Sequence, residues 1–224
     1  MSSDLYIGLM SGTSMDAVDC ALADLSDSMN VVDFINVDIP PQLKQNLLNL
    51  CLENSDNQIK ELGETDVALG RLFASAVISL LEKNQLHKEQ IQAIGSHGQT
   101  IRHQPPGQIA NPFSIQIGDP NTIATLTGIT TVADFRRKDM ALGGQGAPLL
   151  PAFHQYIFKN TKVDRVILNI GGMANITLLR KDDIQITGFD TGPGNILLDT
   201  WIQENLNQSF DKNGDWAASG ESNS

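Results

Sequence analysis

The chain has 224 residues, a formal net charge of −11 and a sequence pI of about 4.6. This acidic balance argues against a nucleic-acid partner, because binding to a phosphate backbone relies on clustered Lys and Arg. We find neither a signal peptide nor an apolar run long enough to cross a membrane, so we expect a cytoplasmic protein with no membrane partner. Cys20 and Cys51 lie in apolar segments without metal or redox spacing, which predicts buried thiols in a reducing compartment.

Hydrophobic periodicity predicts alternating strands and helices in the first two thirds of the chain. Residues 5–10 and 18–25 are expected to form a β-hairpin, and Pro40 and Pro41 are expected to open a helix. The remaining expected elements are a strand at 31–39, a helix at 58–84, a strand at 91–95, a Pro-rich loop at 104–112, a helix at 121–126, a strand at 129–133, a loop at 143–146 and a helix at 148–158.

The same order of elements then begins again. Strands are expected at 166–170, 175–179 and 184–189, a helix at 195–206, and a polar tail without regular structure at 211–224. A strand–strand–strand–helix–strand–helix–strand–helix unit that is used twice describes the actin-like ATPase architecture, an α/β, ribonuclease H-like fold, and here the second copy has only its opening elements. We therefore expect a complete actin-like domain with a linking helix at 1–160, and an incomplete start of a second at 161–224.

The richest candidate site is the turn of the first hairpin. It comprises Gly12, Thr13, Ser14, Met15, Asp16, Ala17, Val18 and Asp19. Backbone N–H groups and hydroxyls in such a turn can bind phosphate oxygens, and the two aspartates could reach Mg²⁺ or its waters. An ordinary polar hairpin turn remains the alternative interpretation.

Two further candidates follow predicted strands. His97, in the stretch Ser96–Thr100, could hydrogen-bond a sugar or a phosphate, or could simply cap a loop. Arg136 or Arg137 could hold a sugar hydroxyl, a carboxylate or a phosphate, or could be solvated charges.

Asp190 lies in a second glycine-rich stretch, before a helix expected to begin near Pro193. A carboxylate there could accept a proton during attack on a phosphate or an acetal. The alternative is a helix N-cap. The sequence contains no G-x-x-x-x-G-K-[ST] motif, which excludes a P-loop kinase.

Together these motifs resemble one family, the anhydro-N-acetylmuramic acid kinases. The resemblance covers residues 5–220 and rests on the segments GLMSGTSMDAVD, AIGSHGQTIRH, QIGDP, VADFRRKDMALGGQGAPLLPAFH, LNIGGMANIT, GFDTGPGN and FDKNGDWAASG, which occur in the family's order. It implies a sugar kinase of cell-wall (murein) recycling that acts on a small-molecule sugar. That kinase would convert 1,6-anhydro-N-acetylmuramic acid, ATP and water into N-acetylmuramic acid 6-phosphate and ADP.

The resemblance also assigns roles to residues. Residues 12–19 would bind the ATP phosphates, and Asp190 would be the catalytic base that takes a proton from the attacking water. His97 and Arg136 would line the sugar side, and Mg²⁺ would bridge the phosphates.

The chain departs from the family pattern in two ways. Ala17 stands where the family usually has Gly, which would strain the backbone by about 1 kcal/mol if that position required a positive φ. The chain also lacks the part that carries the family's adenosine motif and further acidic sugar ligands. We therefore expect little or no kinase activity from this chain alone. The alternative is an inactive remnant, or a subunit that binds sugar or a partner. The family's usual homodimer, or a C-terminal half supplied separately, is the implied partner.

Overall fold

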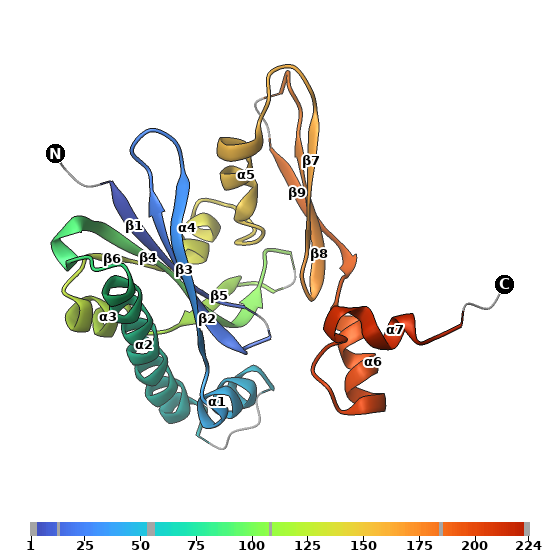
Figure 1. The fold of residues 1–224 in the computed structure, drawn as a ribbon, viewed down its shortest axis with the longest axis horizontal. Coiled ribbons are helices and arrows are strands. Elements are labelled where there is room, and N and C mark those ends of the chain that lie inside the picture. Colours follow the sequence, from blue (N-terminus) through green and yellow to red (C-terminus); the bar gives the residue numbers. More distant parts are fainter. Residues whose placement is uncertain (1–3, 13, 53–56, 108, 184–185, 222–224) are drawn as a thin grey trace. The chain divides into compact units, whose positions relative to one another are not determined.

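The protein was analysed as a computed structural model that describes residues 4–12, 14–52, 57–107, 109–183 and 186–221 (Figure 1). The chain divides into two compact units, Met1–Ala147 (unit 1) and Pro148–Ser224 (unit 2). Among the helices in these ranges, none combines the length and the apolarity that a membrane crossing needs.

Unit 1 is built on a mixed sheet. Its strands are β1 (Leu5–Ser11), β2 (Ala17–Asp24), β3 (Asn30–Asp38), β4 (Ile91–Gln104), β5 (Phe113–Ile117) and β6 (Thr131–Val132). The order is β3-β2-β1-β4-β5, and β6 also pairs with β4. β1 is antiparallel to β2 and parallel to β4, β6 is parallel to β4, and β5 is antiparallel to β4.

This topology confirms the predicted α/β, actin-like class. Three antiparallel strands come first, and the chain then returns to place β4 parallel to β1, at the centre of the sheet. A second crossover adds β6 parallel to β4, which gives the strand order of a ribonuclease H-like sheet. A hairpin partner, β5, is added to the extended end of β4.

Helices supply both crossovers and the core. α1 (Pro41–Leu52) and α2 (Gln58–Lys83) lead from β3 towards β4, through a short 3-10 turn (Lys88–Gln90), and α3 (Pro120–Thr127) leads from β5 towards β6. The apolar face of α2 supplies Leu69, Phe73, Val77 and Leu80, all with no exposed surface, to the same cluster as the sheet residue Ile94. Burial of such side chains, at about 1.5–3 kcal/mol each, is what holds α2 to the sheet.

Unit 2 repeats the opening order of unit 1. After α5 (Leu150–Phe158) come β7 (Arg165–Ile170), β8 (Met173–Leu179), β9 (Thr187–Pro193) and α6 (Ile196–Leu206). The sheet order is β7-β8-β9 with both pairs antiparallel, as in β1-β2-β3. α5 is joined to this sheet by a hydrogen bond of 2.9 Å between the ring of buried His154 and the hydroxyl of Thr177.

Several predicted boundaries are wrong, for identifiable reasons. β4 continues to Gln104 instead of ending at Gly95, because its polar second half is paired in the sheet with β1 and β5. The strand expected at 129–133 is reduced to Thr131–Val132, and β5 and α4 (Phe135–Ala141) were not expected. Residues 184 and 185 of the third expected strand of the repeat lie outside the described residues.

The C-terminal tail also differs from the expectation. It contains a 3-10 turn (Lys212–Gly214) and α7 (Asp215–Ala218). The carboxylate of Asp211 accepts the N–H groups of Trp216 and Ala217, at 2.9 and 3.0 Å. A local side-chain acceptor therefore stabilises a turn of helix that has too few apolar residues to give a periodic pattern.

Candidate functional site

The first-hairpin turn predicted from Gly12 to Asp19 comprises the segment that joins β1 to β2 and the first three residues of β2. The N–H of Met15 donates to the carbonyl of Gly12 at 3.2 Å, and the N–H of Ile39 donates to the carbonyl of Asp16 at 2.9 Å. Thr13 lies outside the described residues. At the start of the turn, the Ser11 hydroxyl is buried and has no hydrogen-bond partner among the described residues.

The left-handed residue of this turn is Met15, with φ of 53°, and its side chain is 5% exposed. Burial of the thioether offsets a conformation that is unusual for a residue with a side chain. Ala17 is already the first residue of β2 and has no positive φ. The strain that Ala17 would have introduced is therefore absent.

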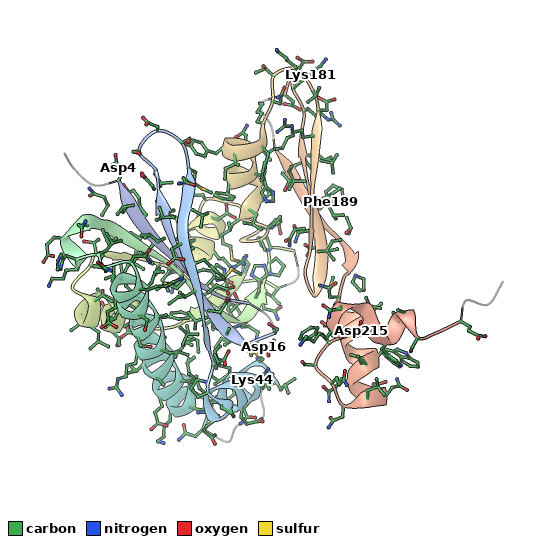
Figure 2. The ribbon with its side chains drawn as sticks, in the orientation of Figure 1. Asp4, Asp16, Lys44, Lys181, Phe189 and Asp215 are labelled. Carbon is green, nitrogen blue, oxygen red and sulfur yellow. The ribbon has the colours of Figure 1, made fainter. Side chains whose placement is uncertain are left out.

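The two aspartates of the turn have protein partners. Asp16 forms an ion pair with Lys44 of α1, and Figure 2 shows the two side chains close together at one end of unit 1. Asp19 accepts a hydrogen bond from the Asn36 amide of β3. Both partners are in exposed surroundings, where exchange for water or a bound ion requires little free energy.

A pocket of about 480 Å³ lies on the other side of β4 from β1. β6 pairs with β4 at Ile94 and Gly95, and β5 pairs with β4 only from Gln99 onward. The edge of β4 is therefore unpaired at residues 96–98, and the pocket fills this gap. Its lining comes from β4, β5 and the segments that precede α3 and α4: Asp66, Ser96, His97, Gly98, Phe113, Ser114, Ile115, Gln116, Ile117, Gly118, Pro120, Ala133, Asp134 and Arg137.

Two of the lining residues each contain a buried polar atom without a partner. The Ser96 hydroxyl and the side-chain carbonyl of Gln116 have essentially no exposed surface and make no hydrogen bond within the described residues. Asp66 of α2 accepts the N–H of Gly118 at 2.7 Å, and burial raises the pKa of its carboxyl, with Asp119 raising it further. A carboxyl with a perturbed pKa in the lining of a cavity is typical of a binding site.

The structure brings the two predicted sugar-side residues together. The Nε–H of Arg136 donates to Nε2 of His97 at 3.0 Å, so the ring proton of His97 is on Nδ1 and is donated to the carbonyl of Gly98 at 2.9 Å. Burial lowers the pKa of His97, and the charge of Arg136 lowers it further. His97 lines the pocket, whereas Arg136 is not among the lining residues.

Sequence reasoning missed several residues of the pocket. Arg137 lines it and pairs with Asp134 at 3.2 Å, although only Arg136 was chosen as a site residue. Ser96 and Gln116 fall within motifs that the sequence had already singled out. Asp66 gave no signal, because it is one of several acidic residues near the start of a helix.

Asp190 belongs to unit 2. It lies within β9 opposite Asn175, its side chain is exposed, and within the described part of the chain its carboxylate has no hydrogen-bond partner. The next helix begins at Ile196 with Asn195 as its N-cap, so the capping interpretation of Asp190 is wrong. The hairpin turn, His97 and Arg136 belong to unit 1.

Comparison with known proteins gives one consistent family. A sequence model of the anhydro-N-acetylmuramic acid kinase family matches residues 4–224. The kinases of that name from Coxiella burnetii (strain RSA 493 / Nine Mile phase I) and Shewanella oneidensis are 59% and 55% identical to the chain, over 98% of its length. The chain spans 58% and 59% of the length of these two relatives.

Solved structures give weaker likenesses. A reductive activator for a corrinoid, iron-sulfur protein has a TM-score of 0.45 at 13% identity, covering 86% of this chain and 32% of its own. A ROK family glucokinase from Streptomyces griseus, solved with glucose and AMPPNP, has a TM-score of 0.36 at 12% identity, covering 85% and 48%. Scores this low carry no argument, and the fold assignment rests on the strand topology. The family match extends over almost every residue that carries the hairpin turn, the pocket and Asp190, and the chain belongs to the anhydro-N-acetylmuramic acid kinase family.

Proposed function

We propose that this chain takes part in an ATP-dependent sugar kinase reaction of cell-wall recycling. The reaction opens the 1,6-anhydro ring of anhydro-N-acetylmuramic acid and phosphorylates O6, which gives N-acetylmuramic acid 6-phosphate and ADP. The observation that carries the proposal is that the hairpin turn and the pocket adjoin two neighbouring parallel strands. Leu9 of β1 is opposite Ser96 and Ser11 is opposite Gln99, so β1 ends, and the turn begins, level with the part of β4 that directly follows the pocket residues 96–98.

The pocket supports a sugar as the ligand. Its volume is within the usual range for small-molecule sites, roughly 300–1,000 Å³. The lining includes the polar residues Ser96, Gln116 and Asp66, whose side chains are of the types that bind sugar hydroxyls. In this proposal His97 forms part of the pocket wall. Arg136, which does not line the pocket, contributes to the sugar side through its hydrogen bond to His97.

The hairpin turn supports ATP as the phosphate donor. Residues 12–19 would bind the phosphate chain through backbone N–H groups, with the unpartnered Ser11 hydroxyl beside them. The carboxylates of Asp16 and Asp19 suit Mg²⁺, which proteins usually bind through one or two carboxylates and the substrate phosphates. When bound, Mg²⁺ would neutralise charge on the phosphates.

In the proposed chemistry, Asp190 accepts a proton from water as the water oxygen forms a bond to the anomeric carbon. The bond between that carbon and O6 breaks. O6 keeps the electron pair and forms a bond to the γ-phosphorus, and the bond from that phosphorus to the β,γ-bridging oxygen breaks. The sugar gains one water and one phosphoryl group, and ADP is the leaving group. An exposed carboxylate without protein partners is free to act on a water in this way.

A second candidate is a chain that binds sugar or a partner without turnover. Unit 2 favours it, because several large apolar side chains of β7 and α6 are exposed: Val166, Leu168, Ile170, Ile196, Leu197, Leu198 and Trp201. Exposed apolar patches mark surfaces that another polypeptide covers. In this candidate the sugar pocket of unit 1 is retained and the catalytic step is lost.

The test is ADP release from the purified chain with ATP, Mg²⁺ and anhydro-N-acetylmuramic acid, combined with calorimetric titration of the sugar alone. Turnover should yield a product heavier by one water and one phosphoryl group. It should be abolished by Asp190→Asn and kept by Asp182→Asn, an exposed aspartate in the turn between β8 and β9. Sugar binding without ADP release supports the second candidate. A folded chain that neither releases ADP nor binds the sugar refutes the kinase proposal and the sugar-binding form of the second candidate.

A further inference from the structure

A chain of hydrogen bonds connects the carboxylate of Asp139, a residue with no role in the proposed reaction, to His97 in the pocket wall. Oδ2 of Asp139, on α4, accepts the N–H of Gly146 at 2.8 Å. The carbonyl of the same Gly146 accepts from Nη1 of Arg136 at 2.6 Å, and Nε of Arg136 donates to His97. The two charged side chains, three residues apart on one helix, therefore hold both peptide groups of one glycine.

The loop after α4 passes close to the Asp139 side chain, and its glycines make that close approach possible. The N–H of Gly144 donates to the Asp139 carbonyl at 2.9 Å, which turns the chain back over the helix. A Cβ on Gly144 would overlap the Asp139 carboxylate, at 2.6 Å from Oδ1. Gly146 is buried, has φ of +74°, and would bring a Cβ within 2.8 Å of Met140. The Asp139 carboxylate therefore occupies the space that Gly144 leaves, and the Met140 side chain occupies the space that Gly146 leaves.

The consequence for His97 is that both ring nitrogens are used inside the protein. Nε2 accepts from Arg136 and Nδ1 donates to Gly98. No ring nitrogen is left for a ligand, so His97 connects the unpaired part of β4 to α4. The position of His97 in the pocket wall depends on the Arg136 guanidinium. Two hydrogen bonds, to the Gly146 carbonyl and to Nε2 of His97, fix the orientation of the guanidinium plane.

We infer that Asp139 is a positioning residue for the pocket. By fixing Gly146 it fixes the Arg136 guanidinium, which in turn fixes the tautomer and orientation of His97. The inference rests on the proposed function only in that it takes the pocket to be the sugar site. A wall that is held in place before binding reduces the conformational entropy that the ligand must remove.

The experiment measures the link directly, by ¹⁵N NMR of the full chain without sugar. We expect a protected Arg136 Nε–H and a His97 ring in the Nδ1–H tautomer. Asp139→Ala should accelerate solvent exchange of the Arg136 Nε–H by about tenfold or more, as expected for the loss of one hydrogen bond, and should mix the His97 tautomers. Asp139→Asn should preserve both signals, because its amide oxygen still accepts from Gly146.

Two further variants guard against trivial explanations. Gly144→Ala removes no hydrogen-bonding group, but its methyl group would displace the carboxylate, so we expect it to reproduce Asp139→Ala. Gln145→Ala, in the same loop and with an exposed side chain, should leave both signals unchanged. Titration with anhydro-N-acetylmuramic acid should show about tenfold weaker binding for Asp139→Ala and Gly144→Ala, and unchanged binding for Asp139→Asn.

The outcomes separate this inference from the proposed function. If the unmodified chain takes no sugar, the proposed function fails, while the NMR comparison still decides whether Asp139 positions Arg136 and His97. The inference is overturned if Asp139→Ala leaves the two signals unchanged, or if Asp139→Asn loses them equally. It is also overturned if the signals change while sugar affinity stays the same.

Discussion

The close packing of the start of α3 against Gly70 of α2 can be tested by substitution, and this packing holds one wall of the pocket. Gly70 is buried on α2, and a Cβ there would lie 2.9 Å from the carbonyl oxygen of Asp119, 3.1 Å from its nitrogen and 3.3 Å from Cβ of Thr122. The first two atoms are backbone, which cannot rotate away. Gly63, on the same helix, has nothing within 4 Å of its Cβ position. Gly70→Ala and Gly63→Ala therefore add the same methyl group to one helix, at a crowded site and at an open site.

The expected effects have opposite signs. Glycine is about 1 kcal/mol less favourable than alanine inside a helix, so Gly63→Ala should stabilise unit 1 by about that amount. At Gly70 the same gain is opposed by overpacking of about 1–3 kcal/mol. The two hydrogen bonds that Asp66 accepts from Gly118 and Asp119 would also weaken, at about 1 kcal/mol each. Gly70→Ala should therefore be net destabilising, by about 2–4 kcal/mol.

Urea unfolding followed by far-UV circular dichroism measures the difference. Both tryptophans, Trp201 and Trp216, lie in unit 2, so tryptophan fluorescence follows that unit separately. The thermal midpoint of unit 1 should move by about 2–4 °C for each kcal/mol. If Gly70→Ala proves as stable as Gly63→Ala, α3 does not pack against α2 as closely as described, and the account of this pocket wall is wrong.

Three other predictions concern titratable groups. Burial lowers the pKa of His97, so the folded state disfavours protonation of its ring. The contribution of neutral His97 to the free energy of unfolding should be fully present above the unfolded pKa, near 6.5, and should be lost as pH falls towards the lowered folded pKa. Thermal midpoints measured against pH should show this loss, and His97→Asn should reduce it. Hydrogen bonds from Lys83 and Asn84 lower the pKa of Asp33 to about 2, so Lys83→Met should raise it towards 3.8 in a carboxyl ¹³C titration, and no change would contradict the ion pair. Burial raises the pKa of Cys20 to about 12, so a thiol reagent should modify half-buried Cys51 first, and the reverse order would contradict the burial of Cys20.

Local patterns in the sequence predicted much of the fold. Two short apolar runs, at 5–10 and 18–25, with a polar, glycine-containing turn between them predicted the first hairpin. The 3.6-residue periodicity predicted α2, because a single face of that helix is buried in the core. The repeated strand–strand–strand–helix order predicted the actin-like class, and the long motifs identified the family. Assignment of the hairpin turn, His97, Arg136 and Asp190 as site residues stays a prediction.

The sequence could not predict the pocket, because the pocket is a property of strand pairing. The strand at 91–95 was expected to end where polar residues begin, yet the chain continues in the sheet to Gln104 and is paired by β5 and β6 at two separate places. Which residues of β4 stay unpaired depends on registers between segments distant in sequence. Ser96 and Gln116 therefore meet in a cavity that no local pattern describes.

The sequence by itself determined the family, the fold class and the residues proposed for the site, because these follow from local composition and order. Tertiary structure alone decided how those residues are used. It paired Asp16 with Lys44, turned both nitrogens of His97 inward, and connected Arg136 to Asp139 through Gly146. Hydrogen bonds between side chains depend on distances of a few tenths of an ångström across the fold, and such distances exist only once the helices and strands have packed.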